Sequence, residues 1–448
     1  MRDLLITALI LGALPWILMR PHVGALMYAW LGLMNPHRLT YGFAYSFPFG
    51  TIVALSTIFS LVISREKKQL PWSSLFIIWL LFIVWMNITT FFALVPDAAI
   101  IEWDRAMKIQ LMVLVTMVLI QGQARINAFV WVIVISLGFF GVKGGIFTIL
   151  TGGQYRVMGP WDTFITDNNT LALALIMTLP LMRYLMLNVT RKALRVGLMA
   201  AMGLTAMSII SSQSRGAFIG GGTILLFLII KSRQRARFMI AAAIAVPIML
   251  LSMPDAWFDR MGTISEYQQD PSAMGRINAW GFAFNLAKDH PITGGGFRVF
   301  TENLFLTYAP NPADFHDAHS IYFEILGEQG FIGLALFLSI GFLSLKYCNR
   351  IIRAARGRTD LIWAGDLAAM LQVSLIGYAT GGAFLGLAYY DLYYDIVAVV
   401  IVLHHHVRMT LTATDAKSKI RESSVDDRHG RKSESSVAGN KWPDGAVR

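Results

Sequence analysis

The chain has 448 residues, of which 55% are hydrophobic and 15% are charged, and it carries a net charge of +11. A soluble domain carries about 25% charged residues. The low charged fraction of this chain therefore excludes a soluble protein and indicates a membrane protein. The excess of Lys and Arg does not indicate nucleic-acid binding, because these residues fall mainly in short loops between long apolar runs. The cytoplasmic loops of membrane proteins have this bias.

The first 35 residues hold two short apolar runs separated by Arg20-Pro21. The first run, residues 4–19, shows no small-residue cleavage site, so we interpret it as a retained membrane segment and not as a signal peptide. Both runs are shorter than the about 20 residues that a spanning helix needs. We therefore predict one crossing over residues 4–35, hinged at Arg20-Pro21, with two separate crossings as the alternative.

The later apolar runs are joined by loops that alternate in charge. The basic loops at 65–68, 191–195, 231–237 and 346–358 are predicted to face the cytoplasm, which leaves the long loop 253–318 on the periplasmic side. This pattern predicts an all-α polytopic membrane protein with about 12 transmembrane helices. The expected parts are N-terminal transmembrane helices in 1–252, a periplasmic loop with an interfacial helix in 253–318, C-terminal transmembrane helices in 319–407 and a disordered cytoplasmic tail in 408–448.

One charged residue, Arg215, lies in the polar turn Ser211–Gly216, between two apolar runs on the predicted outer side. A charge at the centre of a membrane helix costs about 2.5–3.5 kcal/mol, and less near the surface, so such a residue usually has a partner or faces a polar cavity. The turn itself contains no acidic residue. An anionic ligand and the lipid headgroups are the two partners that the sequence leaves open.

The long loop carries a predicted helix and a run of glycines. Residues 272–289 predict a helix in the outer membrane interface, which includes Arg276. Three glycines, Gly294–Gly296, and Arg298 follow. Their backbone N–H groups could converge on an anion around Gly295, but the glycines alone favour a plain turn. The apolar face of the helix would consist of Ile277, Trp280, Phe284 and Ala287.

Residues 314–330 predict the start of the next membrane helix, with Asp317 as its N-cap. At about 100° per residue, Tyr322 lies on the same face as His319, whereas Glu328 points away. His319 would lie in the first turn, where the helix dipole disfavours the imidazolium, so a neutral general base is expected there. A capping or interfacial histidine is the alternative. The sequence shows no phosphate-binding Walker loop and no metal-ligand pattern, so we expect no metal and no cofactor.

These motifs together resemble a known family. The pattern His319-Ser320-x-Tyr322 with Glu328-x-Gly330 resembles the signature of the O-antigen ligase and O-antigen polymerase superfamily. Ser214-Arg215-Gly216-Ala217 resembles its arginine turn, and Arg276-x-x-x-Trp280 with the three glycines resembles its periplasmic-loop pattern. The resemblance covers most of the chain from about 100 to 400. Near the N-terminus, residues 34–38 and 45–48 are similar to a narrower subgroup, the O-glycosylation ligases associated with the exosortase A system.

The resemblance implies an all-helical, C-type glycosyltransferase fold in the bacterial inner membrane. Such an enzyme transfers a glycan from undecaprenyl pyrophosphate to an acceptor hydroxyl, on a protein or on the lipid A core, at the periplasmic face. It implies that His319 activates the acceptor and that Arg215 and Arg276 bind the pyrophosphate. Gly295 and Tyr322 would also lie at the substrate, and Arg298 is included for its position alone.

Two alternatives stay open. A polymerase that extends the glycan on the same lipid carrier would use the same donor groups and the same base, so the motifs do not separate it from a ligase. A transporter of polysaccharide or lipid belongs to another class, and it would predict internal repeats and broken helices in matching halves. No such repeat is visible, and one long outer loop fits a transporter poorly. The expected partners are the lipid-linked glycan, an acceptor protein or lipid A core, and membrane lipids.

Overall fold

The computed structural model describes residues 1–66, 68–232, 235–262 and 270–437, with side chains to residue 414 except those of 237, 256 and 260. The described residues form helices and turns with no strand among them, which confirms the predicted all-α class. The helices are α1 (Arg2–Met19), α2 (Pro21–Met34), α3 (Phe49–Ile63), α4 (Ser74–Phe91), α5 (Pro96–Leu119), α6 (Gln123–Thr151), α7 (Asn168–Asn188), α8 (Lys192–Ser211), α9 (Arg215–Lys231), α10 (Arg235–Leu251), α11 (Asp255–Gly262), α12 (Pro271–Asp289), α13 (Glu302–Tyr308), α14 (Ile321–Ala354), α15 (Ile362–Gly381) and α16 (Asp391–Val437).

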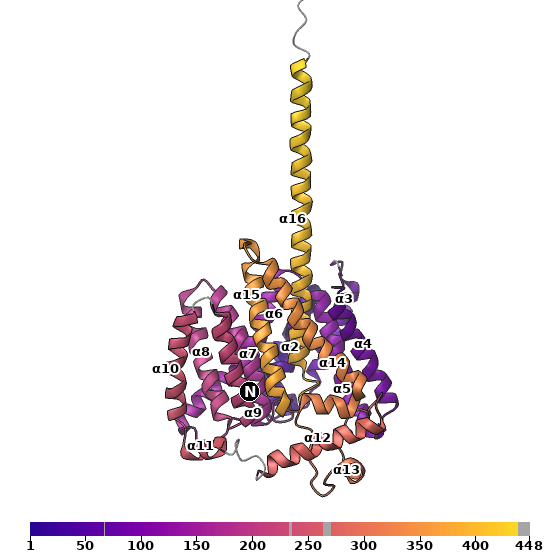
Figure 1. Ribbon diagram of the computed structural model, residues 1–448, viewed down its shortest axis with the longest axis vertical. Helices are drawn as coiled ribbons and strands as arrows, with labels where there is room; N and C mark the ends of the chain where they lie inside the picture. The colour runs from indigo at the N-terminus through magenta and orange to yellow at the C-terminus, as the bar shows by residue number, and fades with distance from the viewer. Residues whose placement is uncertain (67, 233–234, 263–269, 438–448) are drawn as a thin grey trace, which may run out of the picture.

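Most of these helices pack side by side in one bundle (Figure 1). Within the described residues, eight helices are long and apolar enough to cross a membrane, and two shorter apolar helices cover Phe49–Ile63 and Phe238–Leu251. α7 lies at the centre, packed against α6, α8, α9 and α15, and its apolar window is 83% buried. The chain is therefore a polytopic membrane protein, while the number of twelve spans stays a prediction.

The two N-terminal helices form a hairpin. Asp3, at the start of α1, accepts hydrogen bonds at Oδ1 from the backbone N–H groups of Gly42 and Ala44, which follow the end of α2 (3.0 and 3.2 Å). The beginning of α1 therefore lies beside the region after α2, so α1 and α2 run antiparallel. Both helices pack on α3. The preferred prediction of one hinged crossing over residues 4–35 is therefore wrong.

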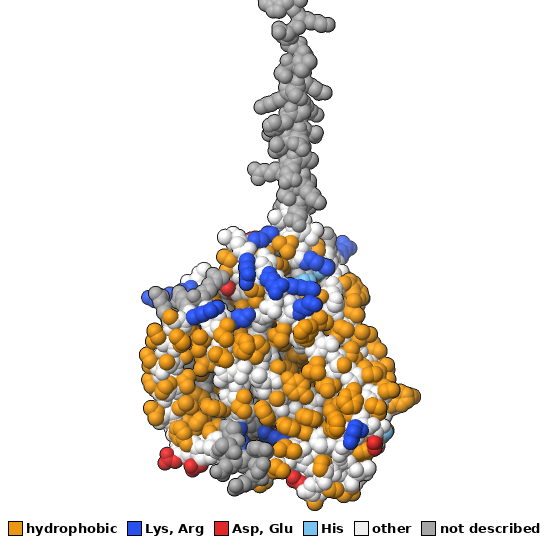
Figure 2. Space-filling view, in the orientation of Figure 1, with side chains coloured by type: hydrophobic (Ala, Val, Ile, Leu, Met, Phe, Trp, Pro, Cys, Tyr) orange, Lys and Arg blue, Asp and Glu red, His pale blue; other side chains and the backbone are white. Residues whose placement is uncertain are grey.

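The two ends of the bundle differ in charge. Lys and Arg gather around the end from which α16 leaves, and a belt of hydrophobic side chains lies below them (Figure 2). This basic end carries the loops 64–73, 189–191, 231–235 and 355–358, of which residues 67, 233 and 234 lie outside the described residues. α16 continues from here as backbone helix to Val437, where the sequence predicts disorder after residue 408. Residues 391–437 contain no proline, so nothing in the chain forces the helix to stop earlier.

The opposite end, which we call the loop end, carries α11, α12 and α13. α12 lies across the bundle there, and α13 lies beneath it (Figure 1). The helix predicted over 272–289 is thus present as α12, although its buried face differs from the predicted one. Trp280 and Ala287 are partly or fully buried, but Ile277 and Phe284 are exposed, because α13 and residues 299–305 cover the other side of the helix.

α14 consists of two helices joined at a kink. Gly330 has φ 67° and ψ −172°, which separates a short first part, Ile321–Gln329, from the long second part that runs through the bundle. A Cβ on Gly330 would lie 2.3 Å from the carbonyl oxygen of Ile292, so only glycine fits at this close approach. The kink keeps the first part of α14 at the loop end, where it contacts α12.

Candidate functional site

Unfavourable backbone conformations are concentrated at the loop end. Positive φ is uncommon for residues other than glycine, and such positions cluster at functional sites. In the described part of the chain, every non-glycine residue with positive φ lies in a segment at this end. These residues are Asn35, Asp162, Gln213, Arg298 and His319. Two of them, Arg298 and His319, are candidate site residues. A third, Gln213, directly precedes Ser214 and Arg215.

Arg215 begins α9 and has a partner that the sequence did not reveal. Its guanidinium forms an ion pair with the carboxylate of Asp270, and both side chains are largely buried. The turn before it is held by Asn168, whose Nδ2 donates to the carbonyl oxygen of Ser212 (2.7 Å). Ser214 caps α9 by accepting at Oγ from the N–H of Ala217 (3.2 Å). The premise that Arg215 lacks an acidic partner therefore needs correction, because its partner lies 55 residues further along the chain.

Asp270 also connects Arg215 to α12. It is the N-cap of α12, and its Oδ1 accepts from the N–H of Ser272 (2.8 Å). The same helix carries Arg276, about two turns further on, and Trp280. The Trp280 indole stacks on Phe323 with ring centroids 4.9 Å apart, and its Nε1 donates to the carbonyl oxygen of Ala318 (2.9 Å). α12 therefore fixes the positions of Arg276 and of the segment that leads into α14.

His319 lies in that segment and not in the first turn of α14. The N-cap of α14 is Ser320, so the predicted N-cap at Asp317 is wrong. Asp317 instead accepts from the N–H of the next residue, Ala318 (2.7 Å). His319 has φ 40°, which ends the extended segment and turns the chain into the helix. The residue as a whole is exposed at the loop end, although neighbouring groups remove part of the hydration of its imidazole.

The surroundings of His319 favour the neutral imidazole. Loss of hydration lowers the pKa of His319 below its ordinary value. The charge of Arg276 lowers this pKa further, whereas Asp317 and Asp167 act in the opposite direction. Contacts join the starts of these helices in pairs: Asn168 with Ser212, Arg215 with Asp270, and Trp280 with Ala318. His319, Arg276 and Arg215 therefore lie at the same end of the bundle, near the starts of α7, α9, α12 and α14.

Helix N-termini favour anions, because their first N–H groups point outward and the helix dipole is positive there. Three of the four N-termini at this site have side-chain caps, from Asp167, Ser214 and Asp270. The fourth, at Ser320, has no side-chain cap. Ser320 Oγ is buried and has no hydrogen-bond partner among the described residues. Among these four, the start of α14, next to His319, is therefore the N-terminus without a side-chain cap, and its first residues are buried.

The three glycines do not form an anion site. The N–H groups of Gly294, Gly295 and Gly296 donate to the carbonyl oxygens of His290, Gly327 and Glu328, at 2.8–2.9 Å. Gly294 and Gly296 have positive φ, and each lies against neighbouring backbone, so the run serves to dock the loop on the kinked start of α14. These amides already have partners, so they give no support to an anion site, and the placement of Gly295 at the substrate stays a prediction. The plain turn that the sequence favoured is the better description.

Two further candidates, Arg298 and Tyr322, have partners within the bundle. Arg298 pairs with Glu102 of α5 (Nε to Oε2, 3.1 Å), and its backbone N–H donates to Glu328 (2.7 Å). Glu328 is nine residues after His319, about 13 Å along a helix of 1.5 Å rise per residue. The hydroxyl of Tyr322 donates to the carbonyl oxygen of Ala379 in α15 (2.8 Å), which ties α14 to the bundle.

Sequence reasoning missed one acidic residue near the site. Glu324, in the first turn of α14, accepts at Oε2 from the N–H of Ala388 (3.1 Å). It approaches the segment around Gly386, and the backbone of His319 lies against the same glycine. An acidic residue in an otherwise apolar helix start is expensive in a membrane protein, so this position could have been noticed from its chemistry. Glu324 holds the 382–390 turn against the start of α14.

An apolar groove begins beside the Arg215 turn. It lies between α8, α9 and α10, and its volume is about 420 Å³. Ser214, Ala217 and Trp257 line it near the site, and Leu228 and Phe238 line it towards the basic end. The groove therefore connects the site to the hydrophobic belt of the bundle.

Comparison with known families divides the chain into two regions. Residues 1–190 match a family of unknown function, DUF5935, and residues 200–338 match the model described as O-antigen ligase. No protein among the curated ones matches the chain. Arg215, Arg276, Gly295, Arg298, His319 and Tyr322 all fall within the second match. Over residues 200–338 the chain is therefore similar to the O-antigen ligases, which supports a membrane enzyme of the ligase type that transfers a glycan.

Proposed function

We propose that the chain transfers a glycan from undecaprenyl pyrophosphate to an acceptor hydroxyl at the periplasmic face of the inner membrane. The observation that carries the proposal is the position of Arg215, Arg276 and His319 at the same end of the bundle, near the starts of four helices, inside the region similar to the O-antigen ligases. Two arginines and helix N-termini suit the pyrophosphate of the donor, because guanidinium groups and N–H groups both bind phosphate oxygens.

The apolar groove supports a donor with a long hydrocarbon chain. It begins at Ser214, next to Arg215, and runs along α9 towards the basic end. A polyprenyl chain in this groove would place its phosphates at the Arg215 turn. The charge distribution supports the orientation, because basic loops face the cytoplasm and the loop end would then face the periplasm.

In the proposed reaction His319 accepts the proton of the acceptor hydroxyl. The hydroxyl oxygen attacks the anomeric carbon of the donor sugar, and the bond between this carbon and the phosphate oxygen breaks. The electron pair leaves with undecaprenyl pyrophosphate, whose growing charge Arg215 and Arg276 stabilise. A hydroxyl is a weak nucleophile until a base takes its proton, so a neutral histidine at the site contributes directly to the rate.

The test uses purified full-length protein, a donor of undecaprenyl-pyrophosphate-linked oligosaccharide, and lipid A core and protein acceptors, with products identified by mass spectrometry. His319→Gln keeps a hydrogen-bonding side chain but cannot act as a base, so we expect normal donor binding and transfer slower by about 10²–10⁴. His316→Gln is the matched control and should have a milder effect, because His316 packs against Gly275 and pairs with Asp314.

Transfer by His319→Gln at the wild-type rate would show that His319 does not act as the base. Loss of donor binding by the same variant would place His319 in the donor site and overturn the proposed division of roles. A ladder of products on the lipid carrier, without acceptor product, would identify a polymerase instead of a ligase.

A further inference from the structure

A second, larger cavity opens at the loop end, away from His319. It lies between the α1–α2 hairpin, α6 and the segment 156–161, and its volume is about 1140 Å³. All of its lining residues fall between Met1 and Trp161, inside the region that matches the family of unknown function. The cavity exceeds the about 300–1,000 Å³ of ordinary small-molecule sites, so it could hold a lipid-sized ligand. We call it the N-terminal cleft.

The walls of the N-terminal cleft are mostly apolar. Leu5 and Leu9 of α1 line one side and are also exposed on the outer surface of the bundle. Phe139, Phe140 and Phe147 of α6 line the other side. Because α1 is an outer helix whose apolar window is only 17% buried, its side of the cleft borders the region that lipid would occupy. Hydrocarbon chains could therefore enter from the membrane.

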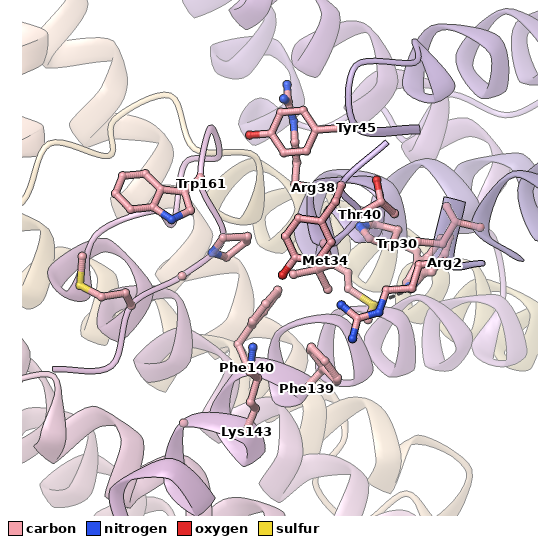
Figure 3. A pocket seen from close by; sticks show the side chains of 18 of the residues that line it. Arg2, Trp30, Met34, Arg38, Thr40, Tyr45, Phe139, Phe140, Lys143 and Trp161 are labelled. Atoms are coloured by element: carbon pink, nitrogen blue, oxygen red, sulfur yellow. Dashed lines mark hydrogen bonds between the residues drawn. The ribbon is translucent and has the colours of Figure 1, made fainter. Parts of the chain in front are cut away.

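The charged residues that line the cleft are all cations. Arg2, Arg38, Lys143 and Arg156 contribute to the lining, and none of the lining residues is Asp or Glu. The Arg2 guanidinium and the Lys143 ammonium extend into the space between the walls, whereas Arg38 lies beside Tyr45 (Figure 3). Four cations without a lining carboxylate make the cleft attractive to an anion.

The nearest carboxylates do not neutralise all four cations. Asp162 pairs with Arg38 (3.5 Å) and accepts from the hydroxyl of Tyr45 (2.6 Å). Asp3 accepts from backbone N–H groups at the end of the α1–α2 hairpin. Lys143 has no hydrogen bond or ion pair within the described residues, although it lies eight residues before the end of the spanning helix α6. A charge at this depth is usually matched by a partner or a polar ligand.

We propose that the N-terminal cleft binds an anionic phospholipid, of the phosphatidylglycerol kind, at a site separate from the Arg215–His319 site. The headgroup phosphate lies among Arg2, Lys143 and Arg156, and the acyl chains lie along α1 and α6. Arginine and lysine both bind phosphate, and the apolar walls exclude a free inorganic anion as the main ligand. This role is assigned to the region of unknown function, and it does not depend on glycan transfer.

The two sites are neighbours. Arg156 donates from Nε to Oε1 of Gln213 (3.4 Å), and Gln213 precedes Ser214 and Arg215. A phospholipid in the cleft would therefore contact Arg156, which is bonded to the side chain that precedes Ser214 and Arg215. This contact gives the bound lipid a route to influence the donor site without sharing its residues.

The test uses purified full-length protein in neutral phosphatidylcholine nanodiscs with a photoactivatable phosphatidylglycerol. We expect crosslinks in the peptides of α1 and of residues 139–161, and competition by phosphatidylglycerol but not by phosphatidylcholine. Lys143→Gln with Arg156→Gln should weaken the affinity behind this labelling roughly a hundredfold, because each of the two lost charge-assisted bonds changes affinity by about one order of magnitude. The matched control is Lys192→Gln with Lys346→Gln, which removes two exposed cations at the basic end and should label normally.

Arg215→Ala distinguishes this site from the donor site. We expect this variant to label as the wild type does, and undecaprenyl pyrophosphate not to compete. Equal loss of labelling in Arg215→Ala, or displacement by undecaprenyl pyrophosphate, would make the cleft a part of the donor site and overturn the proposal. Unchanged labelling in Lys143→Gln with Arg156→Gln would also overturn it. If that double variant fails to fold, the labelling of Lys143→Gln alone decides the question, because the Lys143 side chain is exposed to the cleft and its loss should not disturb packing.

Discussion

Replacement of Asp270 by Asn separates the two roles of Asp270, which caps α12 and forms an ion pair with Arg215. Asp270 caps α12 through Oδ1 and pairs with Arg215 through Oδ2. Asn is as good an N-cap as Asp, so Asp270→Asn keeps the start of α12 while removing the negative charge. If Arg215 must leave Asp270 to bind a phosphate, this change should strengthen donor binding. It should leave the fold intact.

The size of the effect follows from the geometry. The exposed fractions of the Arg215 and Asp270 side chains are 16% and 15%, so solvent screens their pair only in part. Hydrogen bonds to charged groups contribute about 1.5–3 kcal/mol and neutral ones about 0.5–1.5 kcal/mol. In Asp270→Asn the amide oxygen keeps the cap and the amide NH2 group faces the Arg215 guanidinium, so the charged bond, worth at least about 1.5 kcal/mol, is lost and the donor Kd should be roughly tenfold or more lower.

The assay measures donor binding and thermal unfolding on the same purified protein. Asp289→Asn is the control, because it removes the same charge from the exposed far end of α12. Asp270→Ala should lower the Tm, because it also removes the cap, which costs about 0.5–2 kcal/mol. Donor binding by Asp270→Asn that is as weak as in Arg215→Ala, with an unchanged Tm, would refute the reasoning. Asp270 would then position Arg215 for the donor instead of competing with it.

Three further predictions concern other parts of the site. Because the pKa of His319 is lowered, kcat/KM should fall only as the pH drops below the ordinary histidine value of about 6.5, and a midpoint above that value would contradict the assigned environment. Gly330→Ala should lower the Tm markedly, because it adds a Cβ at positive φ against Ile292, whereas Gly197→Ala, in open space on α8, should be neutral or slightly stabilising. Arg298→Ala should reduce transfer by less than about fivefold, since an exposed ion pair such as that with Glu102 contributes about 0–1 kcal/mol, and a larger loss would return Arg298 to the substrate site.

Composition and hydrophobic runs were sufficient to predict the all-α membrane class, because the length and spacing of apolar segments depend directly on the thickness of the bilayer. Composition and run length did not predict the arrangement of residues 4–35, because each apolar run there is short. Run length alone does not show that α1 and α2 fold back and share burial with α3. The antiparallel arrangement is visible only from tertiary contacts, such as those of Asp3 with Gly42 and Ala44, and two separate crossings stay a prediction.

The candidate site was predictable where a residue type carries its own chemistry. His319, Arg215 and Arg276 could be selected from the sequence, and in the structure they lie at the same end of the bundle, while their joint role stays a prediction. The partner of Arg215 could not be predicted, since Asp270 is distant in the chain and no local pattern connects the two. The glycines were misleading for a related reason, because a run with free backbone geometry suits both an anion site and a close packing contact. Only the neighbours of Gly294 and Gly330 decide between these uses.

The docking of the long loop at two points has a consequence for redesign. The loop is held near its start by the Arg215–Asp270 pair and near Gly294–Gly296 by backbone hydrogen bonds to α14. Between α12 and His319, residues 299–316 pack mainly on α12, through a small core that includes Phe282, Leu286 and Phe305. This arm is therefore an exchangeable module: related proteins could vary its length or composition, and an engineer could transplant it together with its α12 face, without disturbing either attachment or the chemistry beside them.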